Sequence, residues 1–132
     1  MRESSNVFHL AIPCRDLDAA AEFYQKLGCQ ICRRYDDRIT INFFGDQVVC
    51  HLAPEKIDAK PEMYPRHFGV TFQSRERFDA ALAHATKERL DFFARPATRF
   101  AGKAEEHRMF FLKDPSNNLI EFKYYYDERM MY

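Results

Sequence analysis

The chain has 132 residues, and its formal net charge is zero because 20 Lys and Arg residues balance 20 Asp and Glu residues. Dedicated nucleic-acid-binding domains carry a basic surplus, so this balance argues against that class of partner. No apolar run reaches the roughly 18 residues that a membrane-spanning helix needs, and the polar start of the chain lacks the apolar core of a signal peptide. We therefore expect a cytoplasmic protein that binds neither nucleic acid nor membrane.

The cysteines are Cys14, Cys29, Cys32 and Cys50. The pair at 29 and 32 has the C-x-x-C spacing of zinc and redox sites, but the sequence holds no second pair to complete a four-cysteine site. The surrounding residues are typical of a strand, in which positions i and i+3 point to opposite faces. We therefore expect four reduced thiols, as is usual in the cytoplasm.

The first half of the chain has the pattern of one helix and four strands. Asp16 is suited to cap the start of the helix and Gly28 to end it, and apolar residues recur at helical spacing between them. Alternation of apolar and polar residues predicts strands on both sides of this helix. The predicted strands are 7–13, 29–35, 39–44 and 47–52.

The second half repeats this plan after a charged, proline-containing linker at about 54–65. Ser74 is suited to cap a second helix, which ends near Leu90. We expect one domain over 1–132, with module one at about 6–53 and module two at about 66–126. The predicted strands of module two are 66–73, 92–95, 108–113 and 119–125, and the last two are joined by a turn at 114–118.

Each half therefore has the order strand–helix–strand–strand–strand, which indicates an internal duplication. The segment HLAI at 9–12 matches HFGV at 67–70, and each stands just before a predicted helix. The fold class that follows is α+β, built from two βαβββ modules.

Polar residues occupy related places in the first and fourth strands of the two modules. They are His9 and His51 in module one, and His67 and Glu121 in module two, and each falls on the face opposite the apolar residues of its strand. A shift of one residue would reverse the face of a strand, so agreement across four strands favours a common site. Three imidazoles and one carboxylate are a donor set suited to a divalent metal ion.

These motifs resemble the vicinal oxygen chelate superfamily, which includes glyoxalase I, extradiol dioxygenases, and fosfomycin- and bleomycin-resistance proteins. The resemblance covers about 7–125. It is carried by HLAIPCRDL at 9–17, FY at 23–24, LG at 27–28, HFGV at 67–70 and DPSNNLIE at 114–121. It implies that the two modules form a U-shaped, curled mixed sheet around a metal site, with the helices on the outer face.

By this resemblance the metal ligands come from the first and fourth strands of each module. His9, His67 and Glu121 match the two-His-one-carboxylate set of the dioxygenases and the fosfomycin enzymes. His51 stands where glyoxalase I has a fourth ligand, usually a carboxylate or Gln, and this departure argues against glyoxalase I activity itself. The implied cofactor is a divalent metal ion: Ni, Zn, Fe(II) or Mn.

Three functions are open. The one we favour is an isomerase or lyase of glyoxalase type, in which the metal stabilises an enediolate and Glu121 moves the proton. The second is an Fe(II) ring-cleaving dioxygenase that uses His9, His67 and Glu121, with His51 as an acid–base group. Both would act on a small molecule that chelates the metal through two neighbouring oxygens. The third is a metal-free protein that binds drugs or metabolites, like the bleomycin-resistance proteins.

Residues on strands that should line the cavity are candidates for binding the substrate. Arg99 and Arg108 suit a carboxylate or phosphate, which a guanidinium holds through two hydrogen bonds, and each equally suits a solvated surface position. His84 and His107 do not fit the repeat and are given no role. Relatives commonly form homodimers, so we expect one here. The candidate substrate-binding residues are Asn42, Phe44, Arg99, Arg108, Met109, Lys123 and Tyr125.

Overall fold

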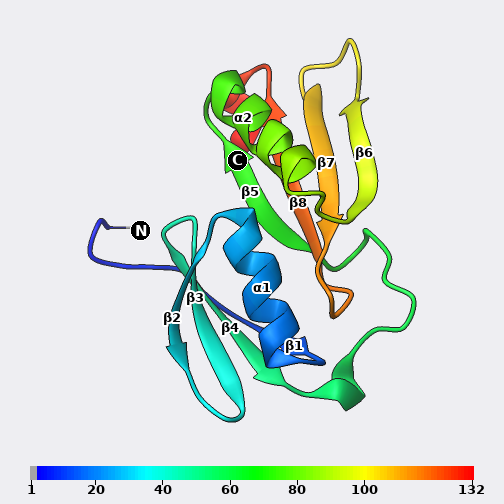
Figure 1. Cartoon of the computed structure of the whole chain (residues 1–132). Coiled ribbons are helices and arrows are strands. Elements are labelled where there is room, and N and C mark those ends of the chain that lie inside the picture. Colours follow the sequence, from blue (N-terminus) through cyan, green and yellow to red (C-terminus); the bar gives the residue numbers. More distant parts are fainter. Residues whose placement is uncertain (1–2) are drawn as a thin grey trace. The chain divides into compact units, whose positions relative to one another are not determined.

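The structure is a computed structural model, and it describes residues 3–132. It divides into two compact units, each containing one mixed sheet and one α-helix (Figure 1). Unit 1 comprises the chain up to Lys60 together with Asp114–Asn118, and unit 2 comprises Pro61–Lys113 with Leu119–Tyr132. In the described part of the chain, neither α-helix combines the length and the apolar composition required to cross a membrane.

Unit 1 holds the first βαβββ module. Its sheet has the strand order β1-β4-β3-β2, in which β1 runs parallel to β4 and the other two pairs are antiparallel. A short 3-10 helix at Pro54–Lys56 follows the last strand. The bounds are β1 His9–Cys14, α1 Leu17–Leu27, β2 Gln30–Arg34, β3 Arg38–Phe43 and β4 Asp46–Leu52.

Unit 2 holds the second module and has the same topology. Its sheet has the order β5-β8-β7-β6, with β5 parallel to β8 and antiparallel pairs elsewhere. A second 3-10 helix, Glu128–Met131, lies near the C-terminus. The bounds are β5 Phe68–Phe72, α2 Arg75–Lys87, β6 Phe92–Arg99, β7 His107–Lys113 and β8 Leu119–Tyr125.

The α+β class and the two βαβββ modules are confirmed. The expected curled sheet consists of two four-stranded mixed sheets, one in each module, and neither closes on itself. The strand predicted over 39–44 ends at Phe43, because Phe44 has a φ of 51° and begins the turn into β4. The strand predicted over 92–95 continues to Arg99, since register shifts in the β6–β7 pair accommodate Pro96.

The predicted helix caps are also confirmed. Asp16 accepts a hydrogen bond from the backbone N–H of Ala19 at the start of α1, and Ser74 accepts one from Arg77 at the start of α2. Gly28 ends α1 with a φ of 101°, a left-handed conformation that glycine adopts at little cost.

Each module buries the face of its sheet that carries the alternating apolar residues. In unit 1 the buried residues include Tyr24 of α1 with Ile39, Ile41, Val48 and Cys50 of the sheet. In unit 2 the core is aromatic: the rings of Phe110 and Phe122 stack with centroids 5.0 Å apart, and Phe78 of α2 lies 5.5 Å from Phe110. The opposite face of the unit 2 sheet carries Met109 and Phe111, which are also buried, together with Glu121.

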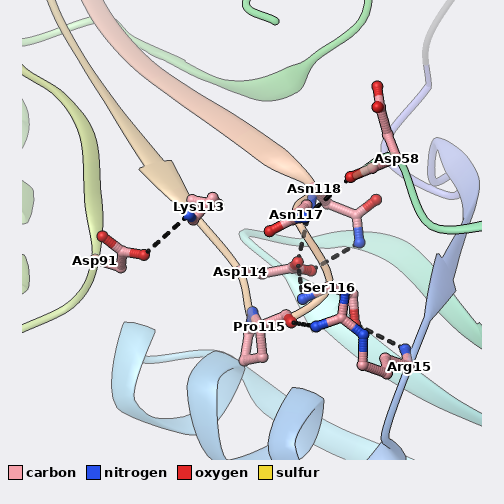
Figure 2. Close-up of polar contacts among 9 residues, drawn as sticks. All are labelled: Arg15, Asp58, Asp91, Lys113, Asp114, Pro115, Ser116, Asn117 and Asn118. Carbon is pink, nitrogen blue, oxygen red and sulfur yellow. Dashed lines mark hydrogen bonds and ion pairs between the residues drawn. The ribbon is translucent and has the colours of Figure 1, made fainter. Parts of the chain in front are cut away.

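The connection between β7 and β8 is a tightly bonded turn that belongs to unit 1 (Figure 2). Asp114 is its buried centre, because Oδ1 accepts hydrogen bonds from the N–H groups of Ser116 and Asn118, and Oδ2 accepts one from Tyr24 Oη at 2.8 Å. Ser116 Oγ also accepts a hydrogen bond from the backbone N–H of Arg15 at 2.8 Å. Burial raises the pKa of Asp114, while these hydrogen bonds oppose that rise.

Candidate metal centre

Strand β8 carries apolar side chains on one face of the unit 2 sheet and charged side chains on the other. Ile120 and Phe122 are fully buried on the face that α2 covers. Glu121 and Lys123 lie on the opposite face, because side chains alternate along a strand. The register places Glu121 opposite Gly69 of β5 and Phe111 of β7. A carboxylate is therefore held in the middle of three paired strands.

Glu121 contacts His67, the residue just before β5. His67 Nε2 lies 3.1 Å from Glu121 Oε2, and the side chains are 21% and 8% exposed, respectively. The other ring nitrogen, Nδ1, donates to the carbonyl oxygen of Met63 at 2.6 Å. A carbonyl oxygen only accepts, so in a neutral ring the proton is on Nδ1 and the lone pair of Nε2 faces the carboxylate.

The surroundings of this pair are largely apolar. Met109, Phe111 and Leu119 form a buried cluster, against which Met63 packs. The ring of His67 meets the ring of Phe111 edge-on, at 5.1 Å between centroids. Outside the imidazole, the charge next to Glu121 is Lys123, whose Nζ lies 3.4 Å from Oε2. A carboxylate in such a place requires compensating positive charge.

Gly69 permits the close approach of β5 to the backbone of Glu121. A Cβ atom added at Gly69 would lie 1.7 Å from the carbonyl oxygen of Glu121, far inside any van der Waals contact. The absence of a side chain at this position therefore sets the spacing between the two strands that carry the pair.

Unit 1 contains a histidine whose ring is oriented in the same way, by a hydrogen bond from Nδ1. His9 opens β1 opposite Gln47 of β4, and its Nδ1 donates to Gln47 Oε1 at 2.6 Å. Its side chain is exposed, and Nε2 again carries the lone pair. His9 and His67 stand at matching places in the two modules, and each has Nδ1 bonded to an amide oxygen, of a side chain in one case and of the backbone in the other.

His51 does not occupy the counterpart of the Glu121 position. Glu121 lies opposite Gly69, two residues after His67. The residue two after His9 is Ala11, and its partner in β4 is Val49. His51 lies opposite Pro13 and is exposed. Positions 49 and 51 have the same parity, so alternation alone cannot distinguish them, and the expected equivalence of His51 with Glu121 is wrong.

The predicted ligands are thus distributed as one close pair and two separate histidines. His67 and Glu121 lie together in unit 2, whereas His9 and His51 lie four positions apart along the β1–β4 ladder of unit 1. Within either unit, residues 3–132 contain no group of three His, Cys, Asp or Glu side chains arranged to hold a metal ion. The donor chemistry of His67 and Glu121 nevertheless fits a divalent ion, because an outer acceptor orients the imidazole as in metal-ligating histidines.

The candidate substrate-binding residues fall into different surroundings. Asn42 lines a pocket of unit 1, and Phe44 is exposed in the β3–β4 turn. Three candidates share the face of Glu121: Met109, Lys123 and Tyr125. Arg99 is exposed at the end of β6, opposite His107. Arg108 pairs with Tyr124, so it lies on the other face of the sheet from Lys123.

Four residues near these sites were not identified from the sequence. Gln47 and Met63 orient the two histidines, and Gly69 sets the approach of β5. His107 is buried, donates through Nδ1 to the carbonyl oxygen of Glu105, and packs 4.8 Å from the ring of Tyr125. The alternation of β7 places His107 on the face of Met109, and this signal was present in the sequence. Nothing in the linker pattern points to the carbonyl of Met63.

The chain matches known proteins over almost its whole length. A curated relative, the glyoxalase domain-containing protein RDO1 of Mycosarcoma maydis, is 25% identical over 122 residues, which is 92% of this chain and 69% of RDO1. A crystal structure of a glyoxalase/bleomycin resistance protein/dioxygenase from Alicyclobacillus acidocaldarius is 56% identical, with a TM-score of 0.96 and 100% of both chains covered.

The fosfomycin resistance protein FosX from Listeria monocytogenes has a TM-score of 0.71 at 16% identity, covering 98% of this chain and 100% of that one. This last likeness shows the fold alone. Residues 6–122 match the model of one protein family. The protein therefore belongs to the Glyoxalase/Bleomycin resistance protein/Dioxygenase superfamily.

Proposed function

We propose that the protein is an enzyme that depends on a divalent metal ion and acts on a small substrate with two neighbouring oxygen atoms. The observation that carries this proposal is the 3.1 Å contact between His67 Nε2 and Glu121 Oε2, with Nδ1 of the same ring bonded to Met63. Two acceptor atoms at this distance are stable only when a proton or a metal cation neutralises the charge between them.

The ligands in this proposal are His67 and Glu121, to which the family resemblance adds His9. Imidazole nitrogen and carboxylate oxygen are common ligands of Zn, Fe(II), Ni and Mn, so the donor set does not select one of these ions. The carbonyl of Met63 and the amide of Gln47 are the outer partners that hold each ring in the ligating tautomer.

The reaction that we favour is proton transfer in an isomerase or lyase of glyoxalase type. A bound divalent ion supplies Lewis acidity, which makes a C–H group beside a carbonyl easier to deprotonate. Glu121 is the carboxylate that accepts the proton, making it the catalytic residue as well as a ligand. Lys123, whose Nζ lies 3.4 Å from Glu121 Oε2, stabilises the negative charge that develops on the substrate.

A ring-cleaving dioxygenase is the second candidate, and the register of β4 favours it. With His51 removed from the set, the remaining donors are His9, His67 and Glu121. Two histidines and one carboxylate, with the other positions open, form the ligand set of non-haem Fe(II) oxygenases. The substrate in that case is a catechol, which also chelates through two neighbouring oxygens.

One set of assays on the full-length protein separates these functions. The protein is stripped of metal and reloaded with Ni, Zn, Mn or, under argon, Fe(II). Exchange of the C–H group of an α-hydroxycarbonyl compound for deuterium, followed by NMR, supports the isomerase or lyase. Oxygen uptake with catechol, seen only with Fe(II), supports the dioxygenase. Failure to retain any of these ions overturns both and favours a metal-free binding protein.

We also propose that the protein forms a homodimer. β1 and β5 are edge strands of their sheets, and an exposed strand edge readily pairs with another chain. Just before β1, Val7 and Phe8 are 59% and 60% exposed, which adds apolar surface at that edge. The mass in solution tests this proposal, and a monomer at micromolar concentration contradicts it.

The state of the cysteines supports a cytoplasmic location. All four are free thiols. Burial raises the pKa of Cys14 to about 11 and that of Cys29 to about 12, so these thiols stay protonated and unreactive at neutral pH. Unpaired cysteines suit a reducing compartment.

A further inference from the structure

Unit 1 carries a pocket of about 210 Å³ beside Gln47, the residue that orients His9. Residues of three strands line it: Arg33 follows an irregularity in β2, Thr40 and Asn42 belong to β3, and Gln47 belongs to β4. The register pairs Asn42 with Gln47 and Thr40 with Arg33, so these four residues share one face of the sheet.

The hydrogen bonds around the pocket determine which amide atoms remain for a ligand. Asn42 Oδ1 accepts a hydrogen bond from the backbone N–H of Gly45 at 2.8 Å. Gln47 Oε1 accepts one from His9 Nδ1 at 2.6 Å. A primary amide has one oxygen and one NH₂ group. Because both oxygens are engaged in these contacts, the NH₂ groups are the parts of Asn42 and Gln47 that are available to a molecule in the pocket.

The other polar groups that line the pocket also leave more hydrogen-bond donors than acceptors available to a ligand. Thr40 Oγ1 accepts a hydrogen bond from the backbone N–H of Arg33 at 3.0 Å, and Asp46 Oδ1 accepts one from the N–H of Phe8 at 2.9 Å. The guanidinium of Arg33 has five N–H donors, and its contact with Tyr35 Oη at 3.1 Å uses one of them. The wall therefore offers the Arg33 cation and two amide NH₂ groups as donors, while Thr40 Oγ1 and Asp46 Oδ1 are engaged, and the carboxylate of Asp46 is the one negative charge among the lining residues.

We propose that this pocket binds the carboxylate end of a small molecule through the Arg33 guanidinium and the amide NH₂ groups of Asn42 and Gln47. A carboxylate is an acceptor-only anion, and charge-assisted hydrogen bonds to it are about twice as strong as neutral ones. Pockets that enclose a whole ligand usually measure roughly 300–1,000 Å³. At about 210 Å³, this one accommodates one end of a molecule.

The position of Gln47 connects the pocket with His9 of the same unit. The same amide gives its oxygen to His9 and its NH₂ group to the pocket, so a carboxylate bound there lies one side chain away from a proposed metal ligand. On the basis of the proposed function, the substrate carries neighbouring oxygens at one end and a carboxylate at the other. Binding to the pocket itself requires no metal.

The test uses the metal-free, full-length protein and the thiol of Cys32, which is exposed and lines the pocket. Neutral iodoacetamide alkylates this thiol, and the rate is measured by mass spectrometry at pH 8 with increasing succinate or its neutral diamide, at constant ionic strength. We expect succinate to slow the alkylation saturably, at least about threefold, and the diamide to leave the rate unchanged. Equal effects of the two compounds, or no effect of succinate, overturn the proposal.

The variant Asn42→Asp tests whether the NH₂ group of Asn42 is needed to bind the carboxylate. It retains an oxygen for the N–H of Gly45, but replaces the NH₂ group with a second, negatively charged oxygen. Gln25→Glu makes the same change of charge on the exposed surface of α1. We expect Asn42→Asp to abolish protection by succinate and Gln25→Glu to retain it. Protection that persists in Asn42→Asp overturns the proposal.

If Asn42→Asp does not fold, as judged by circular dichroism, Arg33→Met replaces it in the same assay with the same expectation. Because the protein is free of metal throughout, a failed metal site leaves the protection by succinate unchanged. In the same way, a loss of protection leaves the metal content of the reloaded protein unchanged, so the two proposals fail separately.

Discussion

His67 Nε2 lies 3.1 Å from Glu121 Oε2. Glu121 belongs to β8, and His67 immediately precedes β5, the strand that pairs with β8. This contact is the core of the proposed metal centre. Because Met63 accepts the proton of Nδ1, the atom of His67 that faces the carboxylate is a lone-pair donor when the ring is neutral. The arrangement explains why a carboxylate is retained among Met109, Phe111 and Leu119.

Replacement of the carboxylate by an amide, Glu121→Gln, removes the negative charge and preserves the size of the side chain. We expect the affinity for Zn or Ni to fall at least about 100-fold, since even the loss of an outer partner of a ligand costs roughly 10–100-fold. Isothermal titration of the metal-free protein measures the change. Glu128→Gln, on the exposed surface, is the matched control and should bind as the unaltered protein does. Equal affinity in the two variants would exclude Glu121 as a ligand.

The register of β4 leads to a prediction about His51. Val49, which is 7% exposed, occupies the counterpart of the Glu121 position, and His51 lies opposite Pro13. We therefore expect His51→Ala to change the metal affinity by less than about twofold, whereas His9→Ala weakens it at least about tenfold. The same titration provides the measurement. A large loss with His51→Ala would restore the four-ligand set and, with it, the argument for glyoxalase-type chemistry.

Gly69→Ala should damage both the fold and the metal centre. The new Cβ would lie 1.7 Å from the carbonyl oxygen of Glu121, so β5 must move away from β8. We expect a loss of about 3 kcal/mol or more in the free energy of unfolding, together with weaker metal binding.

Urea denaturation and metal titration check these effects. Gly102→Ala is the control, because nothing lies within 4 Å of its added Cβ and its φ of 80° costs only about 1–2 kcal/mol. Metal affinity in Gly102→Ala should equal that of the unaltered protein. A Gly69→Ala variant as stable as Gly102→Ala would contradict the close approach.

The buried hydrogen bond from Tyr24 to Asp114 makes a prediction about pH. Burial raises the pKa of Asp114 above its usual value of 3.8, and the Tyr24 hydroxyl opposes this rise. A raised folded-state pKa means that the stability contributed by this carboxyl is full below about pH 3.8 and is lost as the pH rises through the folded-state pKa. Tyr24→Phe raises that pKa further, so its stability should fall more on the alkaline side.

We expect Tyr24→Phe to lower the free energy of unfolding by about 1–3 kcal/mol at neutral pH. The difference in this free energy between the variant and the unaltered protein should narrow toward pH 4. Urea denaturation at several pH values measures both. Tyr132→Phe, on a fully exposed side chain, should show no gap at any pH. A gap that stays constant or widens on acidification would contradict the role of Asp114.

The parts of this account that could be predicted from the sequence are those that depend on local patterns. Asp16, Gly28 and Ser74 mark the ends of the helices through their own backbone and side-chain chemistry. Alternation correctly placed Glu121 on the face opposite Ile120, and the same alternation pointed to His67 as its companion. Each of these inferences needs only residues within one element or its copy.

The parts that could not be predicted depend on pairing between distant segments. The distinction between Val49 and His51 requires the register of β1 against β4, and two positions of equal parity look alike in a pattern of period two. Met63 acts through its backbone carbonyl, which every residue possesses. The pocket beside Gln47 depends on the irregularity in β2 near Arg33, and no residue type in that strand marks it.

Binding of a divalent metal ion by His67 and Glu121 is directly visible in a crystal structure of the protein reloaded with Zn, measured on both sides of the Zn absorption edge. We predict an anomalous peak about 2.0–2.2 Å from His67 Nε2 and from a carboxylate oxygen of Glu121, with His9 as a further ligand and His51 outside the coordination sphere. The absence of a peak at this pair in Zn-loaded crystals, or a peak bound by other residues, would contradict it.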